Sequence, residues 1–224
     1  MTDKSVNNKA KTNRRPLASR QTGWAHRVTA LLANTRITPN QISIGSMISA
    51  ALAGLAFVAA AFTTGATRSL LLITAALFCQ IRLLCNLFDG MVAVEAGKQS
   101  ADGVAWNEFP DRFADIFILA GIGYAISQPA LGWAAATFAV LTAYTRELGA
   151  ANAQGHDFSG PMAKQHRMAL VTLAAIIAAL AAIVAPIDQL LSFELILGCA
   201  LALVAAGSLL TSVRRIYHLL GKLN

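Results

Sequence analysis

Two short stripes of acid and amide side chains near the middle of the chain are the residues best suited to chemistry. Asn86 and Asp89 are three positions apart, so they share one face of a helix. Asn107, Asp111 and Asp115 follow at four-residue intervals, which also places them on one helical face. Their carboxylate and amide oxygens are ligands that Mg²⁺, Mn²⁺ or Ca²⁺ prefers. The spacing therefore predicts a site for a hard divalent cation, formed where two antiparallel helices meet.

The segment around these stripes concentrates the acids of the whole chain. The protein has eleven acidic residues, and six of them lie between positions 89 and 115. Small residues at Gly90, Ala93 and Gly103 would let a ligand approach the backbone closely. A hard cation beside small residues suits pyrophosphate chemistry, and a carboxylate not used by the metal could accept the proton of an attacking hydroxyl.

Several polar residues in and near this segment also have a plainer interpretation. Asn107 would be a helix N-cap if Pro110 fell in the first turn of the next helix. Arg82, one turn before Asn86, would pair with an acid and hold two helices together. Isolated acids such as Glu95 and Asp102 are typical of a solvated loop.

The composition predicts that an all-α integral membrane protein positions these residues. Of 224 residues, 56% are apolar and 13% are charged, against roughly 25% charged in soluble domains. The mean hydropathy is +0.56. This balance excludes a soluble globule and a disordered chain. The three cysteines, Cys79, Cys85 and Cys199, have no spacing typical of disulfides or zinc, so we expect buried apolar side chains.

Six transmembrane helices fit the charge-free runs, since about 20 apolar residues cross a bilayer. Thr38-Pro39-Asn40 predicts a capped helix start, and Ser127-Gln128-Pro129 predicts a hairpin between the third and fourth helices. Pro186 and Asp188 are expected to end the fifth helix. The six spans expected are 40–63, 69–93, 107–127, 130–149, 168–187 and 193–213.

The basic residues indicate how the helices are oriented. The net charge is +7, and residues 1–36 hold eight basic residues against the single acid Asp3. Because basic residues favour the cytoplasmic side, both termini and the acidic segment are predicted there. We expect residues 1–17 to be a basic flexible tail, 18–35 to include an interfacial amphipathic helix, and 18–224 to be one six-helix domain. A nucleic-acid partner is rejected, because no basic stripe interleaves with aromatic residues.

The segment from 86 to 111 resembles the signature of the CDP-alcohol phosphotransferase family. That signature is D-x-x-D-G-x-x-A-R-x8-G-x-x-x-D-x-x-x-D. Asp89, Gly90, Ala93, Gly103 and Asp111 stand in register with it. Three positions differ, because Asn86 and Asn107 replace the first and third acids and Val94 replaces the arginine.

The resemblance implies a multi-pass enzyme of the cell inner membrane that uses Mg²⁺ or Mn²⁺. Such an enzyme moves a phosphatidyl group from CDP-diacylglycerol (CDP-DAG) to an alcohol acceptor and releases CMP. By position, Asp111 would be the catalytic base. The resemblance implies Asn86, Asp89, Asn107 and Asp111 as metal ligands, and Asp115, on the same stripe, would restore one lost charge. The nucleotide would contact Asp89, Gly90, Ala93, Gly103 and Asn107.

A second polar cluster is expected to bind the phosphate of the acceptor or donor. Its members are Arg82, Arg146, Lys164 and Arg167, of which Lys164 and Arg167 stand one turn apart at a predicted helix start. Anchoring of the cytoplasmic side is the alternative for these two residues. Arg82 or Lys98 would replace the missing motif arginine.

Other readings of the same sequence stay open. Relatives often form homodimers, and the small residues Ala50-Ala51-Gly54-Ala56 fit either contact between copies or packing within one chain. Transfer from a CDP-linked small alcohol to diacylglycerol is an alternative reaction, and an inactive membrane scaffold is another. A cation transporter fits less well, because its acids would lie near mid-membrane rather than at a helix end. We expect a divergent active enzyme, because asparagine still offers an oxygen ligand.

Overall fold

The computed structural model is built of helices connected by short segments. It describes residues 21–95, 97–98, 102–152, 154–184 and 191–223, and over these residues it contains seven helices and no strand. A short helix, α2 (Gly23–Ala33), precedes six longer ones. The longer helices are α3 (Pro39–Ala61), α4 (Gly65–Glu95), α5 (Gly103–Ala125), α6 (Pro129–Ala151), α7 (Lys164–Ala181) and α9 (Phe193–Leu223).

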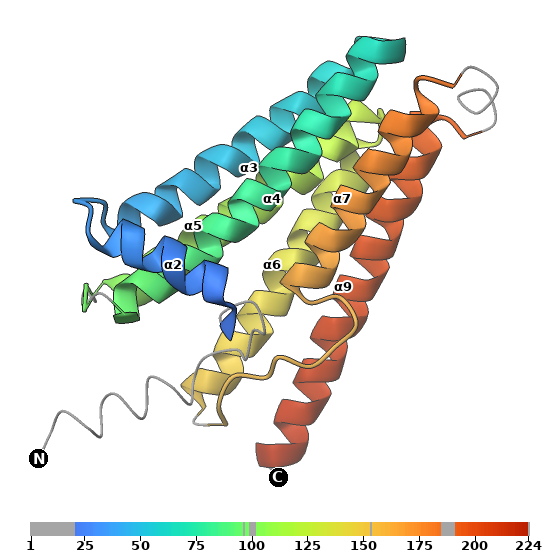
Figure 1. Ribbon diagram of the computed structural model, residues 1–224. Coiled ribbons are helices and arrows are strands. Elements are labelled where there is room, and N and C mark those ends of the chain that lie inside the picture. The colour runs from blue at the N-terminus through green and yellow to red at the C-terminus, as the bar shows by residue number, and fades with distance from the viewer. Residues whose placement is uncertain (1–20, 96, 99–101, 153, 185–190, 224) are drawn as a thin grey trace, which may run out of the picture.

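The six longer helices run side by side in one bundle (Figure 1). Helix α3 packs against α4 and α5, while α6 packs against α5 and α9. Helix α7 closes the arrangement by packing against both α4 and α9. The α4–α5 and α6–α7 connections lie at the same end of the bundle, in the lower part of Figure 1. The end of α4 and the starts of α5 and α7 therefore come together there.

Local sequence signals explain several helix boundaries. The capped start at Thr38 is confirmed, because the Thr38 hydroxyl accepts from the Gln41 backbone N–H at 3.2 Å while the Gln41 side chain accepts from the Thr38 N–H at 2.9 Å. The hairpin at 127–129 is also confirmed. Ser127 has a φ of 57°, and Pro129 begins α6, where its missing N–H has no partner to lose.

The N-cap interpretation of Asn107 is wrong. Helix α5 begins at Gly103, with Asp102 at its N-cap position, so Asn107 lies inside the helix. Pro110 also lies inside α5 rather than in its first turn. Without an N–H, Pro110 cannot donate to the carbonyl of Trp106, yet the helix continues through this position.

Three of the described helices are both long enough and apolar enough to cross a membrane. These are α3, α4 and α9. Helix α5 carries Asp111, Arg112 and Asp115 within its length, which lowers its hydropathy. The six-span count is therefore not confirmed by this criterion and stays a prediction. The predicted stop at Pro186 and Asp188 and the tail of residues 1–17 lie outside the described residues.

Glycine pairs let α5 contact its neighbours at the backbone. A Cβ built on Gly121 of α5 would lie 2.6 Å from the Cα of Gly54 on α3. The same closeness recurs between Gly123 of α5 and Gly132 of α6, where an added Cβ would lie 2.6 Å from the facing Cα. Gly54 therefore packs within the chain, which is one of the two alternatives predicted for this small-residue face. Contact between copies of the chain is not tested.

The N-terminal helix predicted within 18–35 forms over Gly23–Ala33 and packs on α4. The Trp24 and Phe88 rings meet edge to face, with centroids 5.9 Å apart. Thr29 is fully buried, and its hydroxyl donates to the Ala25 carbonyl at 2.8 Å. Figure 1 shows α2 lying across the lower end of the bundle. Its placement at a membrane surface stays a prediction.

We predict that Gly121→Ala destabilises the bundle by about 1–3 kcal/mol, because the added methyl group forces α3 and α5 apart. Thermal unfolding of the purified protein in detergent measures the change. Gly221→Ala is the matched control, since Gly221 is also helical and an added Cβ there meets nothing within 4 Å. Equal melting temperatures for the two variants would contradict the proposed close contact.

Candidate functional site

Asp115 lies at the centre of a buried ion-pair cluster that joins three helices. Its Oδ1 accepts from Arg82 of α4 at 2.8 Å, and its Oδ2 accepts from Arg167 of α7 at 2.6 Å. The Asp115 and Arg82 side chains are both 0% exposed, and that of Arg167 is 2% exposed. Arg167 also donates to the Thr142 hydroxyl of α6 at 3.1 Å. One carboxylate thus ties α4, α5 and α7, with α6 attached through Arg167.

Asp111 lies one helical turn before Asp115 and forms a second cluster. The Asn86 amide donates to Asp111 Oδ1 at 2.9 Å. The Lys164 ammonium donates both to Asp111 Oδ2 and to Asn86 Oδ1. Two guanidinium groups stand slightly farther off, with Arg82 Nη2 at 3.5 Å from Oδ1 and Arg112 Nη2 at 3.7 Å from Oδ2. The predicted antiparallel meeting of the two stripes thus brings Asn86 and Asp111 into contact.

Asp89 continues this cluster one turn farther along α4. Its side chain is buried, and its Oδ2 accepts from the Ser43 hydroxyl of α3 at 2.8 Å. Lys164 and Asp111 lie close enough for their charges to act on the Asp89 carboxylate. Two carboxylates and one amide oxygen therefore face the same region, between α4, α5 and the start of α7.

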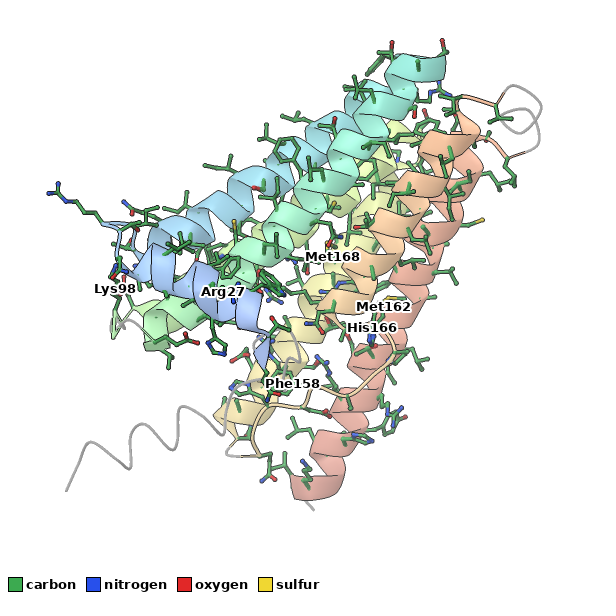
Figure 2. The ribbon with its side chains drawn as sticks, viewed as in Figure 1. Arg27, Lys98, Phe158, Met162, His166 and Met168 are labelled. Atoms are coloured by element: carbon green, nitrogen blue, oxygen red, sulfur yellow. The ribbon has the colours of Figure 1, made fainter. Side chains whose placement is uncertain are left out.

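The segment that leads into α7 is fixed against α9, and this places Lys164 and Arg167. Arg215 of α9 donates to the Ser159 carbonyl at 3.0 Å, and the Met162 N–H donates to the Thr211 hydroxyl at 3.0 Å. Gly160 has a φ of 115°, and a Cβ there would lie 2.4 Å from the Thr211 side chain, so only glycine fits. Figure 2 shows Met162 and His166 together where this segment enters α7.

Asp157 lies in the same segment, outside the helices. The Ser159 N–H donates to its Oδ1 at 2.8 Å, and His218 lies 3.4 Å from its Oδ2. Burial alone raises the pKa of Asp157, but these hydrogen bonds together hold the pKa below its usual value. Asp157 therefore stays ionised and helps fix the segment to α9.

Arg146 lies in a third polar cluster beside the first two. Its guanidinium donates to Glu108 and, at 2.8 Å, to Glu147. Glu108 also accepts from Arg112 at 3.3 Å, which links this cluster to the neighbourhood of Asp111. The Phe158 ring lies 5.9 Å from the Arg146 guanidinium.

The remaining predicted residues lie around the clusters rather than within them. Asn107 is exposed on α5, one turn before Asp111, and Gly90, Ala93 and Gly103 are half-buried. Lys98 donates to the Thr35 carbonyl at 2.9 Å, and Figure 2 places it beside α2, far from His166 at the start of α7. Of the two residues suggested to replace the motif arginine, Arg82 alone reaches the carboxylates.

Sequence reasoning missed Ser43 and Thr142, which hold Asp89 and Arg167. Ser43, Ser46 and Ser49 recur every three residues along an otherwise apolar helix, and all three are buried. The Ser46 hydroxyl donates to the Arg82 carbonyl at 3.2 Å. This serine stripe is the signal in the sequence that α3 faces a polar site. Thr142 offers no comparable pattern.

The residue types at this site are those that a hard divalent cation takes as ligands. Within the described parts of the chain, no group of three or more His, Cys, Asp or Glu side chains is arranged to hold a metal. Asp89 and Asp111 nevertheless offer two carboxylates, and Asn86 adds an amide oxygen, all of which are hard ligands. Asp115 is placed differently, because each of its oxygens already accepts from an arginine. Its predicted metal role competes with those two contacts.

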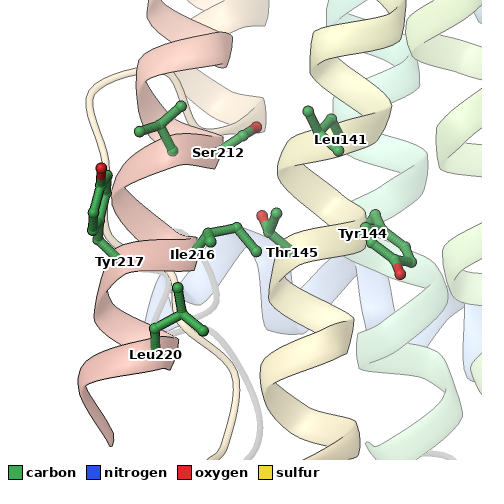
Figure 3. Close-up of a pocket in the computed structure, with 8 residues that line it drawn as sticks. Leu141, Tyr144, Thr145, Ser212, Ile216, Tyr217 and Leu220 are labelled. Atoms are coloured by element: carbon green, nitrogen blue, oxygen red, sulfur yellow. The ribbon is translucent and has the colours of Figure 1, made fainter. Parts of the chain in front are cut away.

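An apolar groove of about 390 Å³ lies between α6 and α9 (Figure 3). Thr145 of α6 lies opposite Ile216 of α9 in this groove, and Leu141, Tyr144, Tyr217 and Leu220 also line it. No member of the three polar clusters lines this groove. The chemistry predicted from the acidic stripes therefore belongs to the region between α4, α5 and α7.

Comparison with known proteins identifies the fold. No protein-family model matches the sequence, and no curated protein sequence matches it. Solved structures of phosphatidylinositol phosphate synthase PgsA1 from Mycobacterium tuberculosis do match. The form with CDP-DAG bound superposes with a TM-score of 0.68 at 18% identity, covering 87% of this chain and 92% of that one. The form in complex with manganese and citrate gives the same TM-score and identity, covering 88% of each chain.

These neighbours define the class of fold. The synthase is a member of the CDP-alcohol phosphotransferase family, so the recognition made from the 86–111 signature is confirmed at the level of the fold. The apo form of the same enzyme agrees, with a TM-score of 0.65 and 16% identity over 85% of this chain and 93% of that one.

We predict that Asp115→Asn lowers the free energy of unfolding by about 3–5 kcal/mol, because it leaves two buried guanidinium groups without their counter-charge. Thermal unfolding in detergent measures the loss. Glu95→Gln is the matched control, because Glu95 is an exposed acid 3.3 Å from His26, and such pairs contribute little. Equal melting temperatures for the two variants would show that the buried cluster is not the main contact holding the helices together.

Proposed function

We propose that the protein is a phosphatidyltransferase that moves the phosphatidyl group of CDP-DAG to an alcohol acceptor and releases CMP. One observation carries the proposal, which is the convergence of Asp89 and Asp111 with Asn86 at one end of α4 and α5. These residues lie within the signature segment. A neighbour with the same fold has CDP-DAG bound, which supports this donor.

We further propose that the chain is a divergent member of the CDP-alcohol phosphotransferase family. It would lie in the cell inner membrane with six spans, with its site and both termini on the cytoplasmic side. The manganese in one neighbour supports a divalent cation, Mg²⁺ or Mn²⁺, as the cofactor. The sites proposed for the nucleotide, at Asp89, Gly90, Ala93, Gly103 and Asn107, follow the register of the signature.

Asp111 is the proposed base. Asn86 donates to one of its oxygens and so fixes the plane of the carboxylate, while Arg82 and Arg112 stand 3.5 and 3.7 Å from its oxygens. An acceptor hydroxyl would give its proton to Asp111 as its oxygen attacks the β-phosphorus. The new P–O bond forms as the bond to CMP breaks, so CMP leaves with the electron pair. A divalent cation held by Asp89, Asp111 and Asn86 would neutralise the pyrophosphate oxygens.

Buried arginines support an anion-binding role beside this base. Arg82 Nε, Arg82 Nη1 and Arg167 Nε are buried and make no hydrogen bond within the described chain. Such donors are costly to leave unmatched, and phosphate oxygens would satisfy them. We propose that Arg82, Arg167 and Lys164 bind a phosphate of the acceptor or donor. Arg146 would assist from its cluster with Glu108.

An inactive scaffold is the second candidate function. It is favoured by the pairing of both Asp111 oxygens, one with Asn86 and the other with Lys164. A base needs one of these contacts to open when substrate binds. Measuring CMP release separates the two functions, because a scaffold releases none with any acceptor or donor.

We expect Asp111→Asn to reduce CMP release by about 10²–10⁴-fold, because the amide cannot accept the acceptor's proton. The assay uses the purified chain with CDP-DAG, Mn²⁺ or Mg²⁺ and a panel of alcohols. Glu95→Gln is the control, since that acid lies on α4 outside the clusters. Undiminished release by Asp111→Asn would show that another group takes the proton.

Metal removal gives a separate prediction. An excess of EDTA should stop CMP release by the wild-type protein, because Asp89 and Asp111 would then lack the cation that neutralises the pyrophosphate. Adding back Mg²⁺ or Mn²⁺ beyond the chelator should restore release. Turnover that continues in the chelator would contradict the proposed cofactor without contradicting the donor.

A further inference from the structure

Lys164 occupies an unusual place for a lysine at the start of a helix. It is the first residue of α7, yet its side chain is only 19% exposed. Its ammonium donates to Asn86 Oδ1 on α4 and to Asp111 Oδ2 on α5. A lysine that only anchored the cytoplasmic side would extend toward water or lipid headgroups. This one turns inward and bridges two oxygens that a metal would otherwise take.

The charges around this bridge leave little room for metal ions. Asp89 and Asp111 are the carboxylates of the cluster that no guanidinium group holds by a direct hydrogen bond from its side chain to theirs, whereas the two oxygens of Asp115 are engaged by Arg82 and Arg167. A single divalent cation already balances two carboxylates. The Lys164 ammonium adds positive charge, and so do the guanidinium groups of Arg82 and Arg112 at 3.5 and 3.7 Å from Asp111.

The two asparagines fit this balance. The uncharged amide of Asn86 still offers an oxygen that accepts from the Lys164 ammonium. The ammonium therefore has a second acceptor without a second carboxylate. Asn107 is exposed on α5, one turn before Asp111. The Lys164 ammonium thus lies beside Asn86, where the family signature has an acid.

We propose that Lys164 is a built-in cation of this site, so that the chain binds at most one divalent cation there and the ammonium competes with it for Asp111. This inference rests on the metal site of the proposed function. It assigns Lys164 a positioning role, because its charge would hold Asp111 and Asn86 together before substrate arrives.

Mn²⁺ binding to the full chain in detergent, followed by the electron paramagnetic resonance signal of free Mn²⁺, tests the proposal. The wild type should bind no more than one Mn²⁺ above the background set by an Asp89→Asn, Asp111→Asn double variant. Lys164→Met should bind Mn²⁺ at least about tenfold more tightly, because the substitution removes a positive charge that repels the metal ion. Lys164→Arg, which keeps the charge, should bind as weakly as the wild type.

Lys222→Met is the control for the loss of a lysine charge, because Lys222 is exposed in the last turn of α9. It should leave Mn²⁺ binding unchanged. Two Mn²⁺ above background in the wild type would overturn the proposal, as would unchanged or weaker binding by Lys164→Met. Two Mn²⁺ in the wild type would overturn the proposal even if Lys164→Met does not fold, which its elution profile reports.

No CDP-linked substrate is present in this experiment, so its result is independent of turnover. A chain that binds Mn²⁺ as expected but releases no CMP would overturn the proposed reaction and leave the role of Lys164 standing. A chain that releases CMP and binds two Mn²⁺ would support the proposed reaction and overturn the proposed role of Lys164.

Discussion

The carboxylate of Asp115, shared between Arg82 and Arg167, is the interaction on which the arrangement of the site depends. All three side chains are almost completely buried, so their charges have no access to water and must compensate one another. Because they come from α4, α5 and α7, the separation of these helices is set by the two ion pairs. Asp111 and Lys164, one turn away on α5 and α7, then meet at a position that the buried cluster determines. The position of the site thus depends on buried charges that must be paired for the protein to fold.

Backbone contact sets the other half of the geometry. Gly54 and Gly121 bring α3 against α5, while α3 also packs on α4, where its Ser43 donates to Asp89. The apolar groove between α6 and α9 is lined by none of the charged side chains of this polar region. The protein therefore separates a tightly packed, charged region from surfaces suited to lipid. That division is compatible with the proposed transfer, which joins an alcohol to a membrane lipid.

The sequence predicted the features that depend on local spacing. The helix start at Thr38, the turn before Pro129 and the meeting of Asn86 with Asp111 all follow from patterns within a few turns. It did not predict that Lys164 reaches Asn86, 78 positions earlier, or that Arg167 takes Asp115 away from the metal ligands. Helical periodicity shows which residues share a face, but not which helix lies opposite that face. Asn107 was misread as a possible cap because Pro110 suggested a helix start, whereas α5 begins at Gly103 and runs through the proline.

The most direct test of the central claim is product formation by the purified wild-type protein. It would be incubated with Mn²⁺, CDP-DAG labelled in its phosphatidyl group and a series of alcohols, and the lipids would then be separated. The proposed function predicts one new labelled phosphodiester lipid, formed with one alcohol and in equal amount to the CMP released. No labelled product with any alcohol would contradict phosphatidyl transfer from CDP-DAG. A product obtained instead from CDP-choline or CDP-ethanolamine with diacylglycerol would show that the same site works with the other kind of donor.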